Sequence, residues 1–357
     1  MKKIIVIAVA LVTTISAMAD EMKWVNALDL GIHGRTQVSE KSPYHRFDPS
    51  LYNFTHKTII DFSKMSSGLY LSFKTDASDI WASWENVPRQ VGDNRTGTMQ
   101  LSVELYVKVD GKWTFASVAR ISTKAKENKR TKPLIKNLPE GEKECLLYLP
   151  MWCEVTSLEV GVNEGATIVG TPSPFRHKVI VHGSSITHGA SAARAGLTYT
   201  AQLSRNLGIN FVNFGFSGLC KMQPEFLETL KACEADAFLF DAFSNPSSKQ
   251  ISERLEGWVE ELVKAHPGKP LIFLQTPINN TLDTKMFATR MERIELVRAI
   301  MGRLTKRYKD VYFLEVKNVT GEEGTIDAVH PNDLGFYRFV NAYQPKIAKI
   351  LKKYGIK

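Results

Sequence analysis

The hydrophobic pattern of the chain changes at about residue 170, which divides the sequence into two parts. Between residues 23 and 169, short runs rich in apolar, β-branched and aromatic residues alternate with turn residues, without a long stretch of helical period. Asp110-Gly111 lies between two such runs and is a strong hairpin signal. The pattern predicts an antiparallel β-sandwich, similar to a jelly roll, over residues 20–170. The expected strands include 69–73, 101–107, 113–118 and 158–162.

In the second part, residues 175–357, short apolar runs alternate with longer segments of helical period. The expected strands cover 177–182, 210–214, 237–241, 270–275 and 311–314, and the expected helices cover 197–207, 224–233, 248–265, 285–308 and 334–353. Mostly apolar strands that alternate with helices are typical of a parallel sheet with helices on both faces, which makes this an α/β domain. Such sheets bind ligands at the carboxyl ends of their strands, so we expect the chemistry there.

A short segment, Gly170-Thr171-Pro172-Ser173-Pro174, joins the two predicted domains. Its two prolines restrict how far the sandwich can swing away from the first parallel strand. We therefore expect the sandwich to lie beside the strand-end face of the parallel sheet and to help shape the binding site.

The first nineteen residues have the pattern of a secretory signal peptide. Lys2 and Lys3 are followed by an apolar run over residues 4–12 and by the small-residue cleavage pattern Ala17-Met18-Ala19. The later sequence has no run of about 20 apolar residues, so no transmembrane segment is expected. The sequence predicts an exported protein, periplasmic or secreted.

Composition narrows the functional classes. The net charge of +9 is spread thinly along the chain and is not combined with a known nucleic-acid-binding motif, so no nucleic-acid partner is expected. Histidines and cysteines lack zinc-site spacing, which predicts no metal and no other cofactor. An exported protein can form disulfides, so the pairing of the four cysteines stays open, and the oligomeric state is not indicated. The cysteines are Cys145, Cys153, Cys220 and Cys233.

A serine follows the first predicted parallel strand, in the sequence Gly183-Ser184-Ser185. At the edge of the sheet, next to the start of a helix, free backbone N–H groups can bind an oxyanion. Thr187 stands where the nucleophile elbow of α/β-hydrolases has its second glycine, which argues against that class.

An aspartate and a histidine three residues apart, Asp327 and His330, precede the last predicted helix. In a tight turn the carboxylate can hold one imidazole nitrogen and leave the other facing a serine. The alternative is that the segment only precedes the helix cap at Asn332 or Asp333. Two further strand ends carry Gly218 and Asn245, which could donate N–H groups to a reacting carbonyl oxygen.

The order serine, glycine, asparagine and Asp-x-x-His resembles the SGNH (GDSL-type) esterase superfamily. It is most similar to the bacterial subgroup that carries an N-terminal β domain with a Gly-x-Asp-Leu-Tyr signature. Ser102 and Glu104 replace the glycine and aspartate of that signature, and Ser184 stands where the wider superfamily has aspartate. The matching segments are 102–106, 148–150, 183–187, 192–199, 213–218, 241–245 and 324–336.

The resemblance implies a flavodoxin-like, doubly wound parallel sheet and a serine esterase. Ser185 would be the nucleophile, His330 the general base, and Asp327 the residue that orients it. The oxyanion hole would consist of the Ser185 and Gly218 N–H groups and the Asn245 side chain. The substrate expected is a small-molecule or glycan ester with a small acyl group, above all acetyl. Arg194 is a candidate substrate contact or, alternatively, a surface arginine. A lipase or acylhydrolase acting on lipid esters and an inactive glycan-binding protein are the other functions considered.

Overall fold

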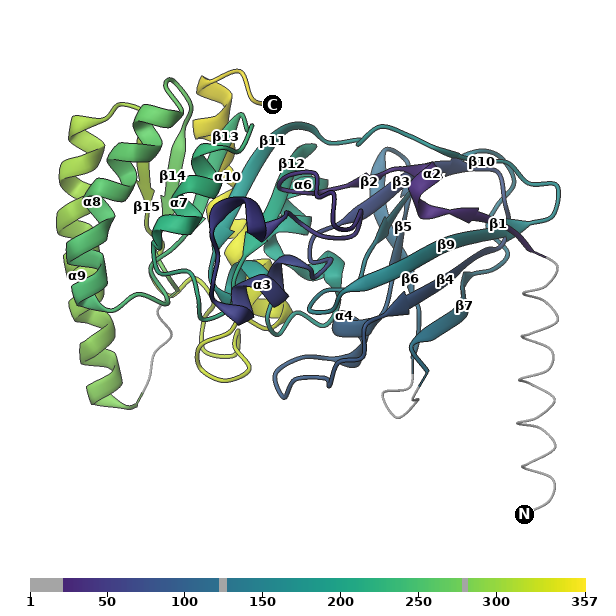
Figure 1. The fold of residues 1–357 in the computed structure, drawn as a ribbon, viewed down its shortest axis with the longest axis horizontal. Helices are drawn as coiled ribbons and strands as arrows, with labels where there is room; N and C mark the ends of the chain where they lie inside the picture. The colour runs from purple at the N-terminus through teal and green to yellow at the C-terminus, as the bar shows by residue number, and fades with distance from the viewer. Residues whose placement is uncertain (1–21, 122–126, 278–281) are drawn as a thin grey trace, which may run out of the picture.

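The computed structural model describes residues 22–121, 127–277 and 282–357 (Figure 1). The predicted signal peptide lies outside these residues. The N-terminal region, residues 22–170, contains two antiparallel sheets. The first sheet has the order β1-β9-β4-β7, and the second has the order β10-β3-β8-β5-β6 with β2 also paired to β3. Their bounds are β1 (Met22–Asn26), β9 (Val155–Asn163), β4 (Ile80–Asn86), β7 (Lys129–Ile135), β10 (Ile168–Gly170), β3 (Tyr70–Thr75), β8 (Lys143–Tyr148), β5 (Glu104–Val109), β6 (Lys112–Val118) and β2 (Ile32–His33).

The central strands of the second sheet, β3, β5 and β8, are buried on both faces, which explains why they have few polar residues. In β3, Leu71 and Phe73 pack into the core between the two sheets, whereas Tyr70 points the other way, into the core shared with the C-terminal region. In β8, Leu147 and Tyr148 divide in the same manner. Side chains alternate between the faces of a strand, so the central strands β3, β5 and β8 each contribute to two cores.

The hairpin predicted at Asp110-Gly111 joins β5 to β6. Both turn residues have positive φ, 49° and 76°, as a type I′ turn requires. Short helices that the sequence analysis did not predict also occur in this region, and one corrects a strand boundary. Residues 97–101 form α4, so the strand predicted over 101–107 begins only at Glu104. These helices are α2 (Ala27–Leu30), η1 (Pro49–Tyr52), α3 (Lys57–Ser63) and α4 (Gly97–Leu101).

The C-terminal region contains the predicted parallel sheet, with the strand order β12-β11-β13-β14-β15. In chain order this is 2-1-3-4-5, the flavodoxin-like arrangement. The strands are β11 (Arg176–Gly183), β12 (Ile209–Gly215), β13 (Ala237–Asp241), β14 (Leu271–Leu274) and β15 (Val311–Leu314). The helices are α5 (Ser185–His188), η2 (Ala195–Leu197), α6 (Tyr199–Leu207), α7 (Pro224–Lys231), α8 (Ser248–Ala265), α9 (Thr284–Arg307) and α10 (Asp333–Lys353).

Helices cover both faces of this sheet. The buried side chains of α6 and α10 share one core with one face of the sheet, and those of α7, α8 and α9 share another core with the opposite face. β11 shows the corresponding alternation, since Val179 and Val181 face α6 and α10 while Ile180 faces the other side. Figure 1 shows α8 and α9 at the end of the molecule farthest from the sandwich.

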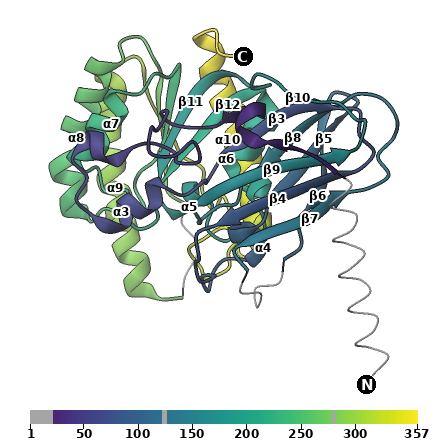
Figure 2. The same cartoon turned by 45° about the vertical axis from the view of Figure 1, so that its right-hand side comes forward.

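The two regions lie side by side in both ribbon views (Figures 1 and 2) and share a continuous core. The ring of Phe47, from the loop before η1, packs edge-on against Phe214 of β12, with centroids 5.1 Å apart. Phe54 packs in the same way against Phe226 of α7, at 5.0 Å. The contact between the regions is therefore part of the hydrophobic interior.

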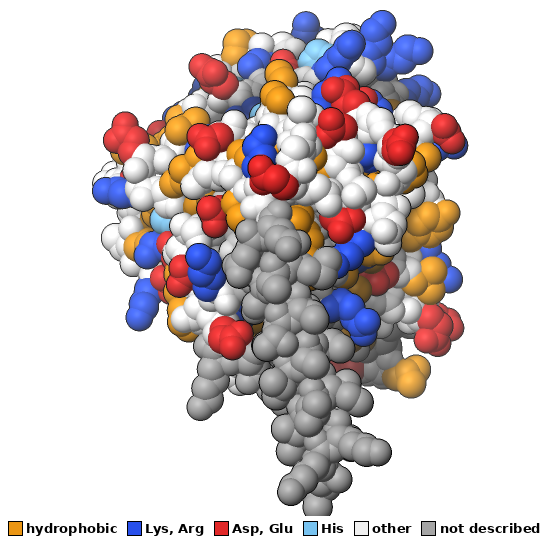
Figure 3. Space-filling view, turned by 90° about the vertical axis from the view of Figure 1, so that its right-hand side faces the viewer, with side chains coloured by type: hydrophobic (Ala, Val, Ile, Leu, Met, Phe, Trp, Pro, Cys, Tyr) orange, Lys and Arg blue, Asp and Glu red, His pale blue; other side chains and the backbone are white. Residues whose placement is uncertain are grey.

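Three further features concern the surface and the cysteines. On the face of the sandwich away from the parallel sheet, acidic and basic side chains are intermixed (Figure 3). No helix in the described ranges is both long and apolar enough to cross a membrane. All four cysteines are buried free thiols, so the structure contains no disulfide between them.

Candidate active site

Ser185 lies at the carboxyl end of β11, as the sequence predicts. Ser184 caps the short helix α5, with its Oγ accepting a hydrogen bond from the backbone N–H of Ile186 over 3.2 Å. Ser185 is therefore the first residue of the helix and is almost fully buried. A Cβ on Gly183 would lie 2.0 Å from Thr187 Oγ1, so only glycine allows this tight passage from strand to helix.

The segment between β15 and α10 brings Asp327 and His330 to Ser185. Asp327 Oδ1 accepts the backbone N–H of His330 over 2.7 Å, which closes a tight turn that contains Ala328 at a φ of 60°. Asp327 Oδ2 lies 2.6 Å from His330 Nδ1, and His330 Nε2 lies 2.8 Å from Ser185 Oγ. The structure thus joins the three predicted catalytic residues in one hydrogen-bonded series.

The environment of Asp327 favours its ionised form. Partial burial acts to raise the pKa of this carboxyl, but hydrogen bonds from the backbone and ring of His330 outweigh it, so the pKa lies below its ordinary value. An ionised carboxylate only accepts hydrogen bonds, so Nδ1 of His330 must donate to it. The Nε2 lone pair of the neutral imidazole then faces the hydroxyl of Ser185.

The predicted oxyanion donors lie on the two loops that follow β12 and β13. The β12 loop is fixed to the end of β11 because the backbone N–H of Phe216 donates to the carbonyl of Gly183 over 2.8 Å. Gly218 in this loop has a φ of 72°, a conformation that favours glycine. Asn245 Oδ1 accepts a hydrogen bond from the backbone N–H of Cys220 over 3.3 Å. This contact uses the oxygen of the side-chain amide and leaves Nδ2 to donate to another acceptor. Gly218 and Asn245 are thus on adjacent, interlinked loops.

A buried carboxylate that the sequence analysis did not assign supports the Ser185 turn. Asp241, at the end of β13, accepts hydrogen bonds from Ser184 Oγ over 2.7 Å and Thr187 Oγ1 over 3.2 Å. Burial raises the pKa of Asp241 to about 6, although these hydrogen bonds oppose the rise. The sequence feature that could have indicated a role for Asp241 is Ser184, which stands where the superfamily has aspartate. In this chain the carboxylate at the turn comes from Asp241 on the neighbouring strand instead.

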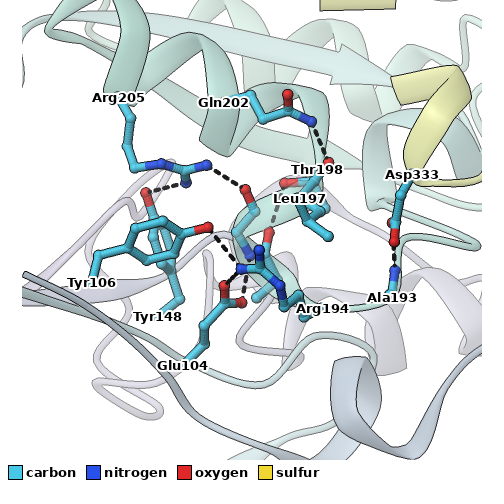
Figure 4. Close-up of polar contacts among 12 residues, drawn as sticks. Glu104, Tyr106, Tyr148, Ala193, Arg194, Leu197, Thr198, Gln202, Arg205 and Asp333 are labelled. Carbon is cyan, nitrogen blue, oxygen red and sulfur yellow. Dashed lines mark hydrogen bonds and ion pairs between the residues drawn. The ribbon is translucent and has the colours of Figure 1, made fainter. Parts of the chain in front are cut away.

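Arg194 is held at the boundary with the sandwich (Figure 4). Its guanidinium forms an ion pair with Glu104, donates to Tyr106 Oη over 2.8 Å, and lies 3.8 Å from the centroid of the Phe115 ring. Glu104 also accepts the backbone N–H of Gly196 over 2.8 Å. The role of Arg194 as a substrate contact stays a prediction, since all of these contacts are with other residues of the chain.

The Glu104 contacts show where the N-terminal signature lies in three dimensions. Glu104 and Tyr106 belong to β5 and meet the loop between α5 and α6, together with Arg205 of α6. On the far side of this loop, the Ala193 N–H donates to Asp333 Oδ1 over 2.8 Å (Figure 4). The loop therefore connects the sandwich to the helix that directly follows the His330 turn.

A second buried side chain from the N-terminal region, Arg46, reaches the loop of Gly218. It donates to the carbonyl of Gly215 over 3.0 Å and to that of Phe62, and it lies over the Phe216 ring at 4.7 Å. Burial lowers its pKa to about 9. Among the described residues no carboxylate lies within ion-pair distance of it. Nothing in the local sequence around Arg46 indicates this contact.

A pocket of about 140 Å³ lies beside Ser185. Ile186, Ser244 and Val329 line it, and these are the immediate chain neighbours of Ser185, Asn245 and His330. Arg290 and Arg293 of α9 also line it. In the described part of the chain, no group of three or more His, Cys, Asp or Glu side chains is placed to hold a metal ion.

A flavodoxin-like parallel sheet preceded by antiparallel sheets is the architecture of SGNH-type hydrolases, and the comparisons with known proteins show that class. Residues 176–348 match the GDSL-like lipase/acylhydrolase family, and residues 22–168 match the N-terminus of SGNH-hydrolase-type esterases. A GDSL-like lipase from Bacteroides ovatus ATCC 8483 is 39% identical, with a TM-score of 0.88 over 93% of this chain and 98% of that one. The chain therefore belongs to the GDSL-like lipase/acylhydrolase family and is an esterase.

More distant structures share the fold. A salicylyl-acyltransferase from a tetracycline biosynthetic pathway is 21% identical, with a TM-score of 0.73 over 94% of this chain and 99% of that chain. A family two carbohydrate esterase from Cellvibrio japonicus is 12% identical, with a TM-score of 0.61 over 93% and 98%. An acetyl xylan esterase from Butyrivibrio proteoclasticus is 12% identical, with a TM-score of 0.55 over 94% and 99%. Comparison with curated protein sequences gives no match.

Proposed function

We propose that the chain is a serine esterase that hydrolyses small acyl esters, above all acetyl esters, on carbohydrate. The observation that carries the proposal is the hydrogen-bonded series of Asp327, His330 and Ser185, with distances of 2.6 and 2.8 Å. A base within hydrogen-bond reach of a hydroxyl, and itself oriented by a carboxylate, is the arrangement that activates a serine.

In the proposed reaction, Ser185 Oγ attacks the ester carbonyl carbon while His330 Nε2 takes its proton. Asp327 keeps the imidazole oriented through Nδ1 and stabilises the imidazolium that forms. His330 then gives the proton to the leaving alcohol, which leaves an acyl group on Ser185. A water molecule, deprotonated by the same nitrogen, releases the acyl group as a carboxylic acid.

The tetrahedral intermediate would be stabilised by three donors, the N–H groups of Ser185 and Gly218 and the side chain of Asn245. Loss of one such donor typically lowers the rate about 10²- to 10³-fold.

The fold shared with two carbohydrate esterases supports a glycan substrate. The inactive glycan-binding alternative is disfavoured because all five proposed functional residues are present.

A second candidate, hydrolysis of lipid esters, is favoured by apolar side chains around the His330 turn. Ile326, Val329 and Leu334 are all exposed there, and exposed apolar residues beside an active site can contact lipid. Rates measured on p-nitrophenyl esters of two to twelve carbons would separate the two candidates. If the protein is a carbohydrate esterase, the hydrolysis rate should be highest for the acetate. A rate that is highest at eight or more carbons would favour lipid esters as the substrate.

The decisive experiment labels the nucleophile. A serine-directed phosphonate is expected to modify Ser185, detected by mass spectrometry, and Ser185→Ala should abolish both labelling and hydrolysis of acetylated xylan, pectin and aryl acetates. Ser191→Ala is the matched control, because that hydroxyl donates to the Asn94 carbonyl over 3.2 Å and does not contact His330. Normal hydrolysis by the Ser185→Ala protein would overturn the proposal.

We further propose that the protein is exported to the periplasm or secreted, on the basis of its first nineteen residues. N-terminal sequencing of the protein purified from its native host should then begin at Asp20. A mature chain that still begins at Met1 would exclude cleavage at this position.

A further inference from the structure

Cys220 lies two residues after Gly218, on the loop that carries this proposed oxyanion donor. Its side chain and its backbone bond to different partners. The thiol Sγ lies 3.4 Å from Nε2 of His182, and the backbone N–H donates to Oδ1 of Asn245 over 3.3 Å. Cys220 and His182 are both fully buried. One residue thus connects β11, the strand that leads to Ser185, with the side chain of the other loop donor.

The direction of the hydrogen bond between His182 and Cys220 follows from the other ring nitrogen. Nδ1 of His182 lies 3.1 Å from the carbonyl oxygen of Phe214, which can only accept, so Nδ1 carries the proton. Burial lowers the pKa of His182 to about 4 and raises the pKa of the Cys220 thiol well above its ordinary value. Both groups are therefore neutral at about pH 7. Nε2 then has a free lone pair, and the S–H of Cys220 donates to it.

The position of His182 is fixed by its surroundings. The rings of Phe214, Phe226 and Trp258 lie 5.3, 4.8 and 6.1 Å from the imidazole, measured between centroids. Close packing of this kind leaves a side chain few other positions. His182 also belongs to a strand that is paired on both sides within the parallel sheet. It is consequently a rigid acceptor that can hold a loop residue in place.

The peptide groups on both sides of Cys220 are fixed by one side chain. Nε2 of Gln223 donates to the carbonyl of Leu219 over 2.6 Å, and Oε1 of Gln223 accepts the N–H of Lys221 over 2.8 Å. The carbonyl of Leu219 and the N–H of Cys220 belong to the same peptide plane, so these contacts also restrict the direction of the Cys220 N–H. This N–H occupies Asn245 Oδ1 and leaves Nδ2 as the donor.

We propose that His182 and Cys220 are positioning residues for the oxyanion hole, because the contact between them holds the Cys220 N–H against Oδ1 of Asn245 and so orients the side-chain amide. The proposal rests on the proposed esterase function, in which Asn245 donates to the oxyanion. Both residues act through Asn245 and not on the ester itself. A donor that is oriented in advance needs no reorganisation while charge develops on the carbonyl oxygen, and this lowers the barrier.

Variants of Cys220 separate its hydrogen-bond donor from its volume. Cys220→Val fills a similar space without a donor and should lower kcat about tenfold with little change in KM, whereas Cys220→Ser keeps an O–H donor and should recover part of the loss. Cys233→Val is the matched control, since Cys233 is also a buried free thiol of the same hydrophobic core, and it should leave kcat unchanged. An unchanged kcat in Cys220→Val, or equal losses in both valine variants, would overturn the proposal.

A double-mutant comparison tests whether Cys220 acts through Asn245. Asn245→Ala removes the proposed donor, so adding Cys220→Val to that protein should lower kcat by less than about twofold. A second full tenfold loss would mean that Cys220 affects the site independently of Asn245, which would overturn the proposal.

Amide hydrogen exchange tests the contacts without any reaction. In a protein isotopically labelled only at cysteine nitrogen, exchange of the Cys220 N–H should accelerate at least about tenfold in Asn245→Ala and in His182→Phe. The Cys233 N–H, which donates to the Leu230 carbonyl, should exchange at an unchanged rate. Faster exchange at Cys220 in a protein that hydrolyses no ester would retain the network and refute the esterase. Ester hydrolysis with unchanged exchange in His182→Phe would retain the esterase and refute the positioning role.

Discussion

Arg46 of the N-terminal region donates a hydrogen bond to the carbonyl of Gly215, 3.0 Å away, at the base of the loop that carries Gly218. A fully buried guanidinium without a carboxylate partner is costly, because burial disfavours its charged form. Its location gives a reason for that cost. The Arg46 guanidinium fixes the end of β12, from which the loop with the proposed oxyanion donor Gly218 extends.

We predict that Arg46→Met lowers kcat while KM changes little, because the loop of Gly218 loses its support. The carbonyls of Gly215 and Phe62 would also lose a donor, which should reduce the free energy of unfolding by about 1–3 kcal/mol for each group. Steady-state kinetics well below the variant's Tm and chemical denaturation measure the two effects. Arg35→Met is the control, since Arg35 contacts Pro43 and not the C-terminal region. An unchanged kcat in a folded Arg46→Met protein would contradict the prediction.

Replacing Asp327 with asparagine should lower kcat by about 10² to 10⁴-fold and leave KM nearly unchanged, because His330 would lose its preferred tautomer. Pre-steady-state kinetics with an aryl acetate would show the loss in the acylation step. A variant with normal kcat would assign the histidine's orientation to another group.

Asp241 should make stability depend on pH in the direction opposite to most carboxylates. Its pKa is about 6 in the folded protein against an ordinary 3.8, so the folded protein keeps this proton where the unfolded chain has lost it. The contribution of Asp241 to stability therefore decreases as the pH rises from about 4 to about 6. Denaturant titrations at pH 4, 5, 6 and 7 should show this decrease relative to Asp241→Asn. The surface variant Asp93→Asn should run parallel to the unmodified protein, and parallel curves for Asp241→Asn would refute the prediction.

The ion pair between Glu104 and Arg194 should contribute to the contact between the two regions. Glu104→Gln leaves Arg194 with a neutral partner, and Arg194→Met leaves the Glu104 carboxylate buried without its cation. A double-mutant cycle on the free energy of unfolding should give a coupling of about 1–3 kcal/mol. The exposed pair of Lys74 and Glu142 is the reference, for which the cycle should give a much smaller coupling because solvent screens the two charges. Equal coupling in both cycles would mean that Glu104 acts only through Gly196.

The sequence was most informative where local pattern decides structure. The strands of the parallel sheet and most of its helices lie within one or two residues of their predicted bounds, because apolar runs and helical period alternate cleanly there. The sandwich strands were identified by composition, but α4 was not, since a five-residue helix has too few turns to show a period.

The candidate site could be proposed from motifs whose partners are near in sequence, such as Asp327 and His330. The contacts of Arg46, Glu104 and Asp241 could not be predicted from the sequence, because each of these residues bonds to a residue more than fifty positions away. Such pairs arise from packing between elements and leave no periodic trace. The expectation that the sandwich lies beside the active region came from the short joining segment. The structure adds that β5 and the loop of Arg46 are among the segments that make the contact.

The order of the chain gives the shared core a consequence for biogenesis. Tyr70, Tyr106 and Tyr148 form an apolar face of the sandwich that becomes buried only against the C-terminal region. Gly215, which accepts from Arg46, is synthesised 169 residues later. This face of the nascent sandwich therefore stays exposed to water and to other chains until the C-terminal region has been synthesised. Exposed apolar surface of this kind makes a folding intermediate prone to aggregation and a target for chaperones.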